Sequence, residues 1–476
     1  MAWSSSSKSQ SPPELNVVQP YRMHVSQKYL DLTRQKLELT RLPREPRFAQ
    51  NEVDFGVVKH DLEPLLDHWL ESYDWRAQEL YYNDALPQFR VPINATRLHY
   101  VHQRSASASA IPLLIIHGWP ESFITSSKVI DALCNPITTP PRGDDSIQAF
   151  HVVVPSIPGF AFSEPVPEVA NNIHGTAEVF DALMKGLGYG RYMIHGSGWG
   201  FRIARMLTLL HPESCLALHT VNPEVPAPRS TFGYLTEDVA AFSDPMSNLS
   251  LHTPGLTPPL TPALSNPVRD RPQTSAYALC DSPIGLMAHM LDAIQPPRAA
   301  NPSPAHSPAT LRIPPSIASP MTPQSAGVSP QSSRSPHSPA GEAPAYWDSG
   351  SGGQLASPWS PMALVNWTML YWLPGPEVAL RWLTNSSHFL PTLWTGFNMC
   401  PIGVTLFREA TMGAGEHHTP PQWLEAYHRV AMIKRREGRV RFALWERPGD
   451  VVLDIREFAG LLNSRPPTGP SITNGM

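Results

Sequence analysis

Cysteine and long hydrophobic runs are both scarce in this 476-residue sequence. Its four cysteines, Cys134, Cys215, Cys280 and Cys400, lie far apart, form no Cys-x-x-Cys pair and have no histidine at ligand spacing. We therefore expect isolated thiols in a reducing compartment and no metal site. No run approaches the roughly 20 apolar residues that span a bilayer. The first residues lack the apolar segment of a signal peptide, so we expect a cytoplasmic protein without a membrane span.

An excess of charge of one sign is also absent. The chain carries 36 lysines and arginines against 40 aspartates and glutamates, a formal net charge of −4. Neither nucleic acid nor an anionic membrane surface is therefore an expected partner. Hydrophobic residues make up 41% of the chain, which is enough for a large buried core. No cofactor is expected, and the sequence leaves the oligomeric state open.

Proline, in contrast, is abundant, with 54 residues. It concentrates with serine in residues 251–268 and about 296–345, where apolar periodicity is almost missing. Such segments cannot offset the entropy of ordering, so we expect disorder there, in 1–15 and in 466–476. A regulatory or scaffold role for 296–345, through its Ser-Pro and Thr-Pro sites, and an origin of this segment in the gene model both stay open.

The rest of the chain alternates helices, loops and strands. Residues 25–39 and 61–69 have helical spacing and residues 97–102 alternate as a strand, so a helical arm should lead into a sheet. Continuous apolar runs at 111–116 and 151–155 suit strands that are covered on both faces. We predict an α/β fold with a mostly parallel sheet, helices on both faces, and functional loops at one end of the strands.

A sharp turn joins a predicted strand at 190–194 to a predicted helix at 201–210. Small residues two before and two after one central position permit the strand-to-helix bend of a nucleophile elbow. Gly196 and Gly200 are these small residues, so the centre is Gly198. Glycine carries no nucleophile, so the frame of a catalytic site is present without its reacting atom.

A shift of register does not supply that atom. With Ser197 at the centre, His195 and Trp199 would stand where only small side chains fit. We therefore treat Ser197 as a spacer rather than an activated serine. A plain glycine-rich loop that cradles phosphate is the alternative interpretation of this turn.

Three loops, taken in order, carry a family resemblance. His117–Pro120 (His-Gly-Trp-Pro), Pro155–Phe160 (Pro-Ser-Ile-Pro-Gly-Phe) and Gly196–Gly200 resemble the microsomal-type epoxide hydrolase family, as do Tyr73–Arg76 in the arm and Tyr371–Leu373 further on. The resemblance implies the α/β-hydrolase fold with an N-terminal arm and a helical lid that carries the insertion. The expected divisions are a disordered start (1–15), the epoxide hydrolase-like arm (16–105), the first part of the core (106–230), the lid (231–395), the second part of the core (396–465) and a disordered tail (466–476).

The resemblance also implies a reaction, the hydrolysis of an epoxide to a vicinal diol. An aspartate at the elbow forms an ester, a histidine oriented by an acid activates water, and tyrosines protonate the epoxide oxygen. The aspartate position is Gly198, and the histidine position before Phe442–Glu446 is Arg441, which stays protonated and cannot act as a base. The acid position corresponds to Glu409, one residue short of the expected spacing, and a donor tyrosine to Tyr371.

The loops that would stabilise an oxyanion match the family pattern more closely than the nucleophile and base positions do. Trp119 and Trp199 would present backbone N–H groups to the site while their rings pack in the core and line the pocket. His117 and His195 lie beside buried strands, where a histidine is more typical of the core than of a substitute base.

Two kinds of function follow. The chain is either a weak or inactive family member that binds a small hydrophobic molecule such as an epoxide, or an enzyme that opens epoxides by acid-assisted direct attack. In the second case Tyr371, Glu409 or Asp281 would polarise the epoxide for water or an internal hydroxyl. The family resemblance points to detoxification or secondary metabolism in either case.

Overall fold

One nine-stranded sheet organises the part of the chain that the computed structural model describes, residues 18–44, 56–94, 96–136, 148–228, 271–294, 359–408 and 419–464. The order across the sheet is β1-β2-β3-β5-β4-β6-β7-β8-β9. The strands are β1 (Gln19–Tyr21), β2 (Gln88–Ile93), β3 (Thr96–Gln103), β4 (Ile111–Ile116), β5 (Phe150–Pro155), β6 (Tyr192–Gly196), β7 (Cys215–Val221), β8 (Asn398–Arg408) and β9 (His428–Glu437).

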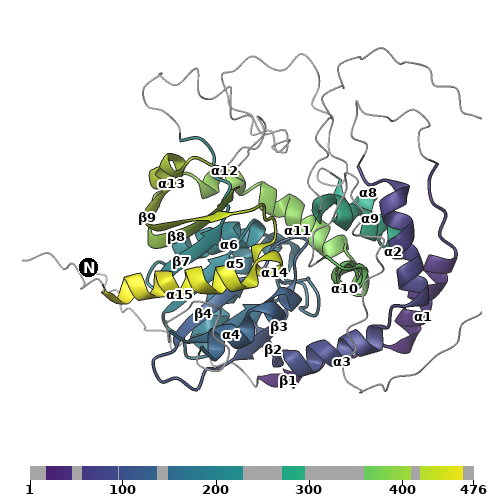
Figure 1. The fold of residues 1–476 in the computed structure, drawn as a ribbon, viewed down its shortest axis with the longest axis horizontal. Helices are drawn as coiled ribbons and strands as arrows, with labels where there is room; N and C mark the ends of the chain where they lie inside the picture. The colour runs from purple at the N-terminus through teal and green to yellow at the C-terminus, as the bar shows by residue number, and fades with distance from the viewer. Residues whose placement is uncertain are drawn as a thin grey trace, which may run out of the picture.

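Helices cover the sheet and extend beyond it into an arm and a lid (Figure 1). The helices of the described residues are α1 (Gln27–Glu38), α2 (Lys59–Glu71), α3 (Trp75–Ala85), η1 (Phe123–Lys128), α4 (Ile130–Cys134), η2 (Glu168–Ala170), α5 (Ile173–Gly186), α6 (Trp199–Leu210), α8 (Pro272–Leu279), α9 (Pro283–Ile294), α10 (Pro361–Trp372), α11 (Glu377–Ser387), α12 (Leu390–Leu393), α13 (Pro421–Tyr427), α14 (Ala443–Glu446) and α15 (Pro448–Ser464).

The prediction of a mostly parallel sheet is confirmed. Strands β5, β4, β6, β7, β8 and β9 are parallel neighbours, whereas β1, β2 and β3 join the edge of β5 in antiparallel pairs. In β4, the side chains of Leu113, Leu114 and Ile115 have no exposed surface. A strand with neighbours on both edges and helices over both faces must be apolar throughout, as this one is. Because β4, β5 and β6 run in the same direction, the loops that follow them meet at one edge of the sheet.

The two helical layers can be told apart by their contacts. Helix α5 packs against α6, and α6 packs on β4, β6, β7 and β8. Helix α15 packs on β8, α4 packs on β5, and a guanidinium N–H of Arg456 in α15 donates to the carbonyl oxygen of Ala132 in α4. Figure 1 shows α15 crossing in front of the sheet on the same side as α4.

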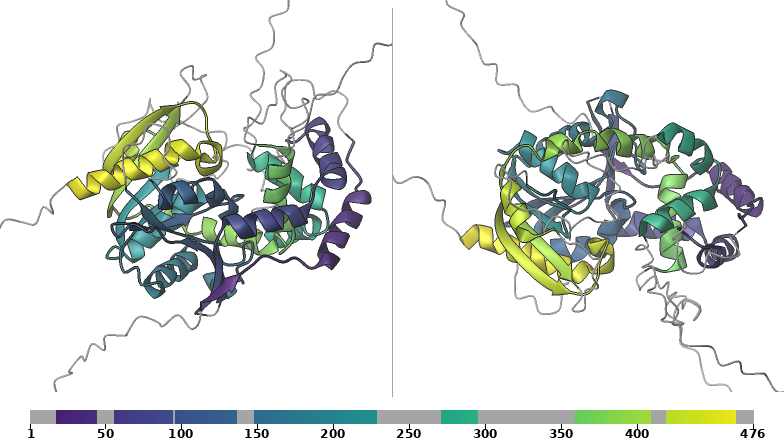
Figure 2. Two further views of the ribbon diagram at one scale, coloured as in Figure 1. Left: turned by 60° about the horizontal axis from the view of Figure 1, so that its bottom comes forward. Right: turned by 90° about the horizontal axis from the view of Figure 1, so that it is seen from above.

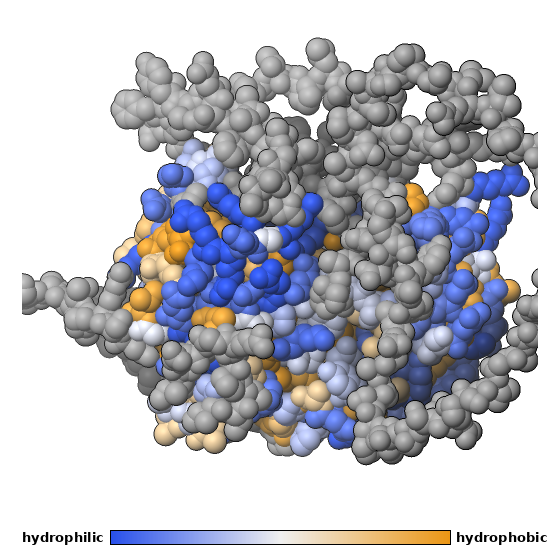
Figure 3. Space-filling view, viewed as in Figure 1, coloured by the Kyte–Doolittle hydropathy of each residue, from blue (hydrophilic) through white to orange (hydrophobic). Residues whose placement is uncertain are grey.

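The arm wraps around the lid rather than around the sheet. Figure 2 shows α1 to α3 curving along the outside of the lid helices α8 to α10. The Trp372 Nε1–H of α10 donates to Thr33 Oγ1 of α1 at 2.8 Å, and the Tyr73 hydroxyl donates to Asn366 Oδ1 at 2.8 Å. The outward side of the arm is predominantly hydrophilic where Figure 3 shows it, at the right. The arm therefore ties its helices to α10, the lid helix that carries Tyr371.

The predicted helices at 25–39 and 61–69 correspond to α1 and α2, and the predicted strands at 97–102, 111–116 and 151–155 to β3, β4 and β5. The segments predicted to be disordered, 1–15, 251–268, about 296–345 and 466–476, lie outside the described residues. No helix of the described ranges is long and apolar enough to cross a bilayer.

Candidate functional site

The turn between β6 and α6 places Gly198 at its apex, as the residue that precedes the helix. The backbone of Gly198 has φ +53° and ψ −120°, a conformation that side-chain-bearing residues rarely adopt. A Cβ built on Gly196 would lie 2.7 Å from the carbonyl carbon of Gly200, and one on Gly200 would lie 2.1 Å from the Ile116 oxygen. These two glycines are therefore required by close backbone packing.

The central glycine is not required in that way. A Cβ built on Gly198 would meet nothing within 4 Å, so it would project into open space. The bend thus has the geometry that presents a side chain at its apex, and no side chain is present. A ligand or water can occupy the room in front of this residue.

The loop after β4 lies directly against the elbow. A Cβ built on Gly118 would lie 3.2 Å from the Trp199 nitrogen. His117 joins this loop to the one after β5, because Ile157 N–H donates to its Nε2 at 3.2 Å and its Nδ1–H donates to the Gly118 oxygen at 3.1 Å. Burial lowers the pKa of His117 to about 4. Both ring nitrogens are used by the backbone, so this imidazole is a neutral structural group rather than a base.

Aromatic rings form a continuous wall between this loop and the elbow. The ring centroids of Trp119 and Tyr371 are 4.5 Å apart, those of Tyr371 and Phe160 5.8 Å, those of Phe160 and Trp382 5.5 Å, and those of Trp382 and Trp199 5.4 Å. All four pairs are edge-to-face, an arrangement that aromatic quadrupoles favour. The wall connects the two tryptophans predicted to flank the site and gives it an apolar side.

Tyr371 reaches from the lid to the loop after β4. Its hydroxyl donates to the backbone oxygen of Glu121, and its side chain is buried. Burial raises the pKa of Tyr371 well above its usual value, so the phenol stays protonated. The single O–H of this phenol is donated to the Glu121 oxygen, so a ligand oxygen takes this hydrogen bond only by replacing that acceptor.

Sequence reasoning missed Glu121 as a site residue. Its carboxyl is buried, with 6% of the residue exposed, and Gly118 N–H donates to its Oε2 at 3.2 Å. Burial raises the pKa of Glu121 to about 7. The signal for it was present in the sequence, because an acidic residue directly follows the His-Gly-Trp-Pro loop at the end of a fully apolar strand.

The loop that carries Arg441 is tied to the end of β7 and to α14. The Asn222 side-chain amide donates to the Val440 oxygen at 3.3 Å, and the N–H groups of Arg441 and Phe442 donate to the Glu446 carboxylate at 3.2 and 3.1 Å. The Arg441 side chain is exposed. An arginine thus occupies the loop at the carboxyl edge of the sheet where a base was sought. Glu409, the candidate orienting acid, lies outside the described residues.

His195 belongs to a buried network on the α15 side of the sheet. Its Nδ1 lies 3.0 Å from His219 Nδ1, His219 Nε2 lies 3.2 Å from Thr405 Oγ1, and the Thr405 hydroxyl donates to Asp454 Oδ2 at 2.7 Å. Since the threonine proton goes to the carboxylate, His219 must donate from Nε2 and accept at Nδ1, and His195 must donate from Nδ1. Burial lowers the pKa of both histidines, so they are neutral core groups.

Asp281 is not part of the elbow site. It lies at the turn between α8 and α9 with 72% of its side chain exposed, and its carboxylate pairs with Lys36 of α1. The hypothesis that Asp281 polarises an epoxide is therefore wrong, because its charge is held at the surface between lid and arm.

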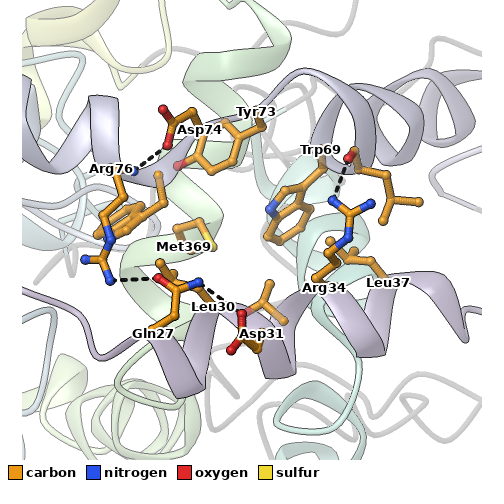
Figure 4. A pocket seen from close by; sticks show the side chains of 13 residues that line it. Gln27, Leu30, Asp31, Arg34, Leu37, Trp69, Tyr73, Asp74, Arg76 and Met369 are labelled. Atoms are coloured by element: carbon orange, nitrogen blue, oxygen red, sulfur yellow. Dashed lines mark hydrogen bonds between the residues drawn. The ribbon is translucent and has the colours of Figure 1, made fainter.

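A separate cavity of about 290 Å³ lies in the arm, between α1, α2, α3 and α10. Figure 4 shows Trp69 and Met369 among its apolar lining residues and charged side chains around its rim. The rim groups bond to one another, as Gln27 Nε2 donates to Asp31 at 3.0 Å and Arg76 donates to Gln27 at 3.2 Å. Its lining includes no residue of the elbow or of the loops after β4 and β9, so this cavity is distinct from the site at Gly198.

Within the described ranges, no group of three or more histidine, cysteine, aspartate or glutamate side chains is placed to hold a metal ion.

The chain matches two family descriptions. Residues 18–126 match "Epoxide hydrolase N terminus", and residues 111–264 match "alpha/beta hydrolase fold". Together these matches cover the arm, the loop after β4 and the elbow.

Curated relatives share the same region of the chain. A protein of Stigmatella aurantiaca (strain DW4/3-1) that bears an epoxide hydrolase name is 31% identical over 279 residues, 58% of this chain and 60% of that protein. "Juvenile hormone epoxide hydrolase 1" of Ctenocephalides felis is 28% identical over 58% of this chain and 59% of its own length. "Epoxide hydrolase 1" of Sus scrofa is 27% identical over 58% and 62%, so this chain spans about three fifths of these relatives.

Solved structures resemble the whole described fold. The epoxide hydrolase of Aspergillus niger superposes with a TM-score of 0.67 at 20% identity, covering 95% of this chain and 99% of that one. The juvenile hormone epoxide hydrolase of the silkworm Bombyx mori gives 0.64 at 18% identity, covering 94% of both chains. At these identities the likeness concerns the fold.

The parallel sheet, the strand-to-helix elbow and the helical lid define an α/β-hydrolase-fold protein. Within that class, the N-terminal arm and the named relatives make the assignment narrower. The chain carries the N-terminal region described for epoxide hydrolases and is similar to curated proteins that bear that name.

Proposed function

We propose that this protein binds a small hydrophobic molecule, such as an epoxide, in front of the elbow and does not form an ester with it. The observation that carries the proposal is Gly198, which occupies the apex of the elbow with open space before it. An ester intermediate requires a carboxylate at the apex. Glycine offers a hydrogen atom there, so the covalent route has no nucleophile.

The surroundings support a ligand of this class. The wall of Trp119, Tyr371, Phe160, Trp382 and Trp199 provides apolar contact surface. The N–H groups of Trp199 and Gly200 at the start of α6 have no acceptor within the helix and can bind an oxygen of the ligand. Those of Phe201 and Arg202 donate to the Ser197 and Gly198 oxygens. The names of the relatives, epoxide hydrolase and juvenile hormone epoxide hydrolase, support an epoxide as the ligand class.

A second candidate is acid-assisted opening of an epoxide by direct attack of water. The protonated hydroxyl of Tyr371 favours it, because it lies beside the loop that faces the elbow. A phenol can protonate an epoxide oxygen whether or not an ester forms. Binding of an epoxide is common to both candidates.

The test is to incubate the protein with styrene oxide, measure binding by quenching of tryptophan fluorescence and record the intact mass of the protein. We expect saturable quenching, because Trp119 and Trp199 flank the site, and an unchanged protein mass. Replacing Trp199 with leucine should reduce the quenching, while Trp69→Leu in the arm cavity serves as the matched control. A covalent adduct on the unmodified chain, or the absence of saturable binding, contradicts the proposal.

A further inference from the structure

Glu121 has a buried carboxyl that accepts one backbone hydrogen bond. Only 6% of the residue is exposed, and its hydrogen bond comes from the Gly118 N–H at 3.2 Å. Within the described ranges no ion pair joins it to a cation. A neutral glutamine could accept the same hydrogen bond, so holding the Gly118 turn does not require an acid.

Burial disfavours the charged form of the Glu121 carboxyl. Burial raises the pKa of Glu121, the Gly118 N–H lowers it, and the nearby Glu446 raises it again, with a result of about 7. Burying a carboxylate without a paired cation is unfavourable, because it loses its hydration. A carboxyl that is half protonated near neutral pH can, however, accept and return a proton at that pH.

The backbone places this carboxyl next to the elbow. Glu121 bonds to Gly118, and a Cβ on Gly118 would lie 3.2 Å from the nitrogen of Trp199, the residue after the apex. The hydroxyl of Tyr371 donates to the backbone oxygen of Glu121, so the phenol lies against the residue that carries the carboxyl. A Cβ at Gly198 would meet nothing within 4 Å, so the apex next to Trp199 leaves room for a ligand.

We propose that Glu121 accepts the proton of a water molecule that opens the epoxide directly, while Tyr371 protonates the ring oxygen. This inference rests on the proposed function, because it requires an epoxide before Gly198. The water oxygen bonds to a ring carbon, the bond between that carbon and the ring oxygen breaks, and its electron pair stays on the oxygen. Glu121 takes one proton from the water. Tyr371 exchanges its hydrogen bond to the Glu121 backbone oxygen for one to the ring oxygen and gives its proton to that oxygen. A proton then passes from the Glu121 carboxyl to the Tyr371 phenolate, and the diol leaves.

Absence of the aspartate makes this route possible. A water molecule can occupy the space that a carboxylate at residue 198 would fill, and no covalent intermediate competes with it. A general base near its working pH contributes a factor of about 100 to 10,000 to a rate. The diol oxygen then comes from solvent in the first turnover.

The experiment measures styrene oxide binding and the first turnover in ¹⁸O-labelled water for the full chain and three variants. The unmodified chain should form diol with one solvent oxygen, at a rate that falls below an apparent pKa near 7. Glu121→Gln should retain binding, form diol about 100-fold more slowly and lose this pH dependence, whereas Glu121→Asp should keep part of both. Glu79→Gln controls for the loss of a buried carboxyl, since Glu79 in the arm is equally buried, at 6% exposure. Because Glu79 also pairs with Arg76, urea unfolding checks that this variant is folded.

The outcomes separate this inference from the proposed function. No binding of styrene oxide by the unmodified chain overturns the proposed function and the inference with it. Binding without diol overturns the role of Glu121 alone. A folded Glu121→Gln protein that forms diol at the unmodified rate, or with the same pH profile, also overturns it.

Discussion

A carboxylate introduced at residue 198 would have both the room and the direction to act as a nucleophile, at a calculable cost in stability. A Cβ at Gly198 meets nothing within 4 Å, so the first side-chain atom of Gly198→Ala or Gly198→Asp creates no steric overlap. Their cost is the backbone conformation, φ +53° and ψ −120°, which lowers the free energy of unfolding by about 1–3 kcal/mol for a residue with a side chain. Gly200→Ala is the contrasting variant, because its Cβ would lie 2.1 Å from the Ile116 oxygen. We expect that variant to lose about 3 kcal/mol or more, or not to fold.

Urea unfolding of the three variants measures these differences, and intact-mass spectrometry with styrene oxide measures the chemistry. Folded Gly198→Asp should gain the mass of one epoxide. The ester should persist when Glu121→Gln is added, because neither Arg441 nor a glutamine can activate water to cleave it. Adding Arg441→His should release the ester and permit turnover. Two results would refute the reasoning: Gly200→Ala as stable as Gly198→Ala, or a folded double variant that never forms an ester.

Two further predictions concern stability. Burial lowers the pKa of His99 and His219 to about 3, against 6.5 in the unfolded chain. The unfolded chain therefore binds protons below pH 6.5 that the folded chain does not, and the two histidines together lower the free energy of unfolding by about 3 kcal/mol at pH 5.5. Equal urea midpoints at pH 7.5 and 5.5 would contradict this prediction. Asp454→Asn should lower the free energy of unfolding by about 2–4 kcal/mol, because the fully buried Asp454 carboxylate pairs with Arg436 at 2.6 Å. Glu457→Gln, at the exposed pair with Lys434, should lower it by less than about 1 kcal/mol. Similar losses in the two variants would show that burial does not decide the difference.

Local patterns were sufficient for the elements whose apolar residues repeat regularly. The run at 111–116 coincides with β4, since a strand paired on both edges needs nothing but apolar residues. Capping decides where a helix begins: α5 starts at Ile173, because the Asn172 side chain accepts hydrogen bonds from the N–H groups of His174 and Gly175.

Strand β9 was not predicted. It runs from His428 to Glu437 and carries Lys434, Arg435 and Arg436, charges that argue against a buried strand. It lies at the edge of the sheet, where only one side is paired, and its Arg436 is satisfied by Asp450 and Asp454 of α15. These partners lie on a helix that follows the strand, and no local pattern in the strand indicates them.

The glycines around residue 198 could be interpreted without coordinates, because a strand that turns at once into a helix leaves space only for hydrogen at fixed offsets. The residue types at 198 and 441 likewise exclude an aspartyl ester and an imidazole base at those positions through their chemistry alone. Tertiary packing decided which polar side chains lie in water and which do not. Asp281 and Glu121 are both acidic residues in loops, yet the first pairs with Lys36 at the surface and the second is buried beside the elbow. Burial depends on segments far apart in the sequence, so only the folded chain distinguishes a solvated carboxylate from one whose proton affinity is raised.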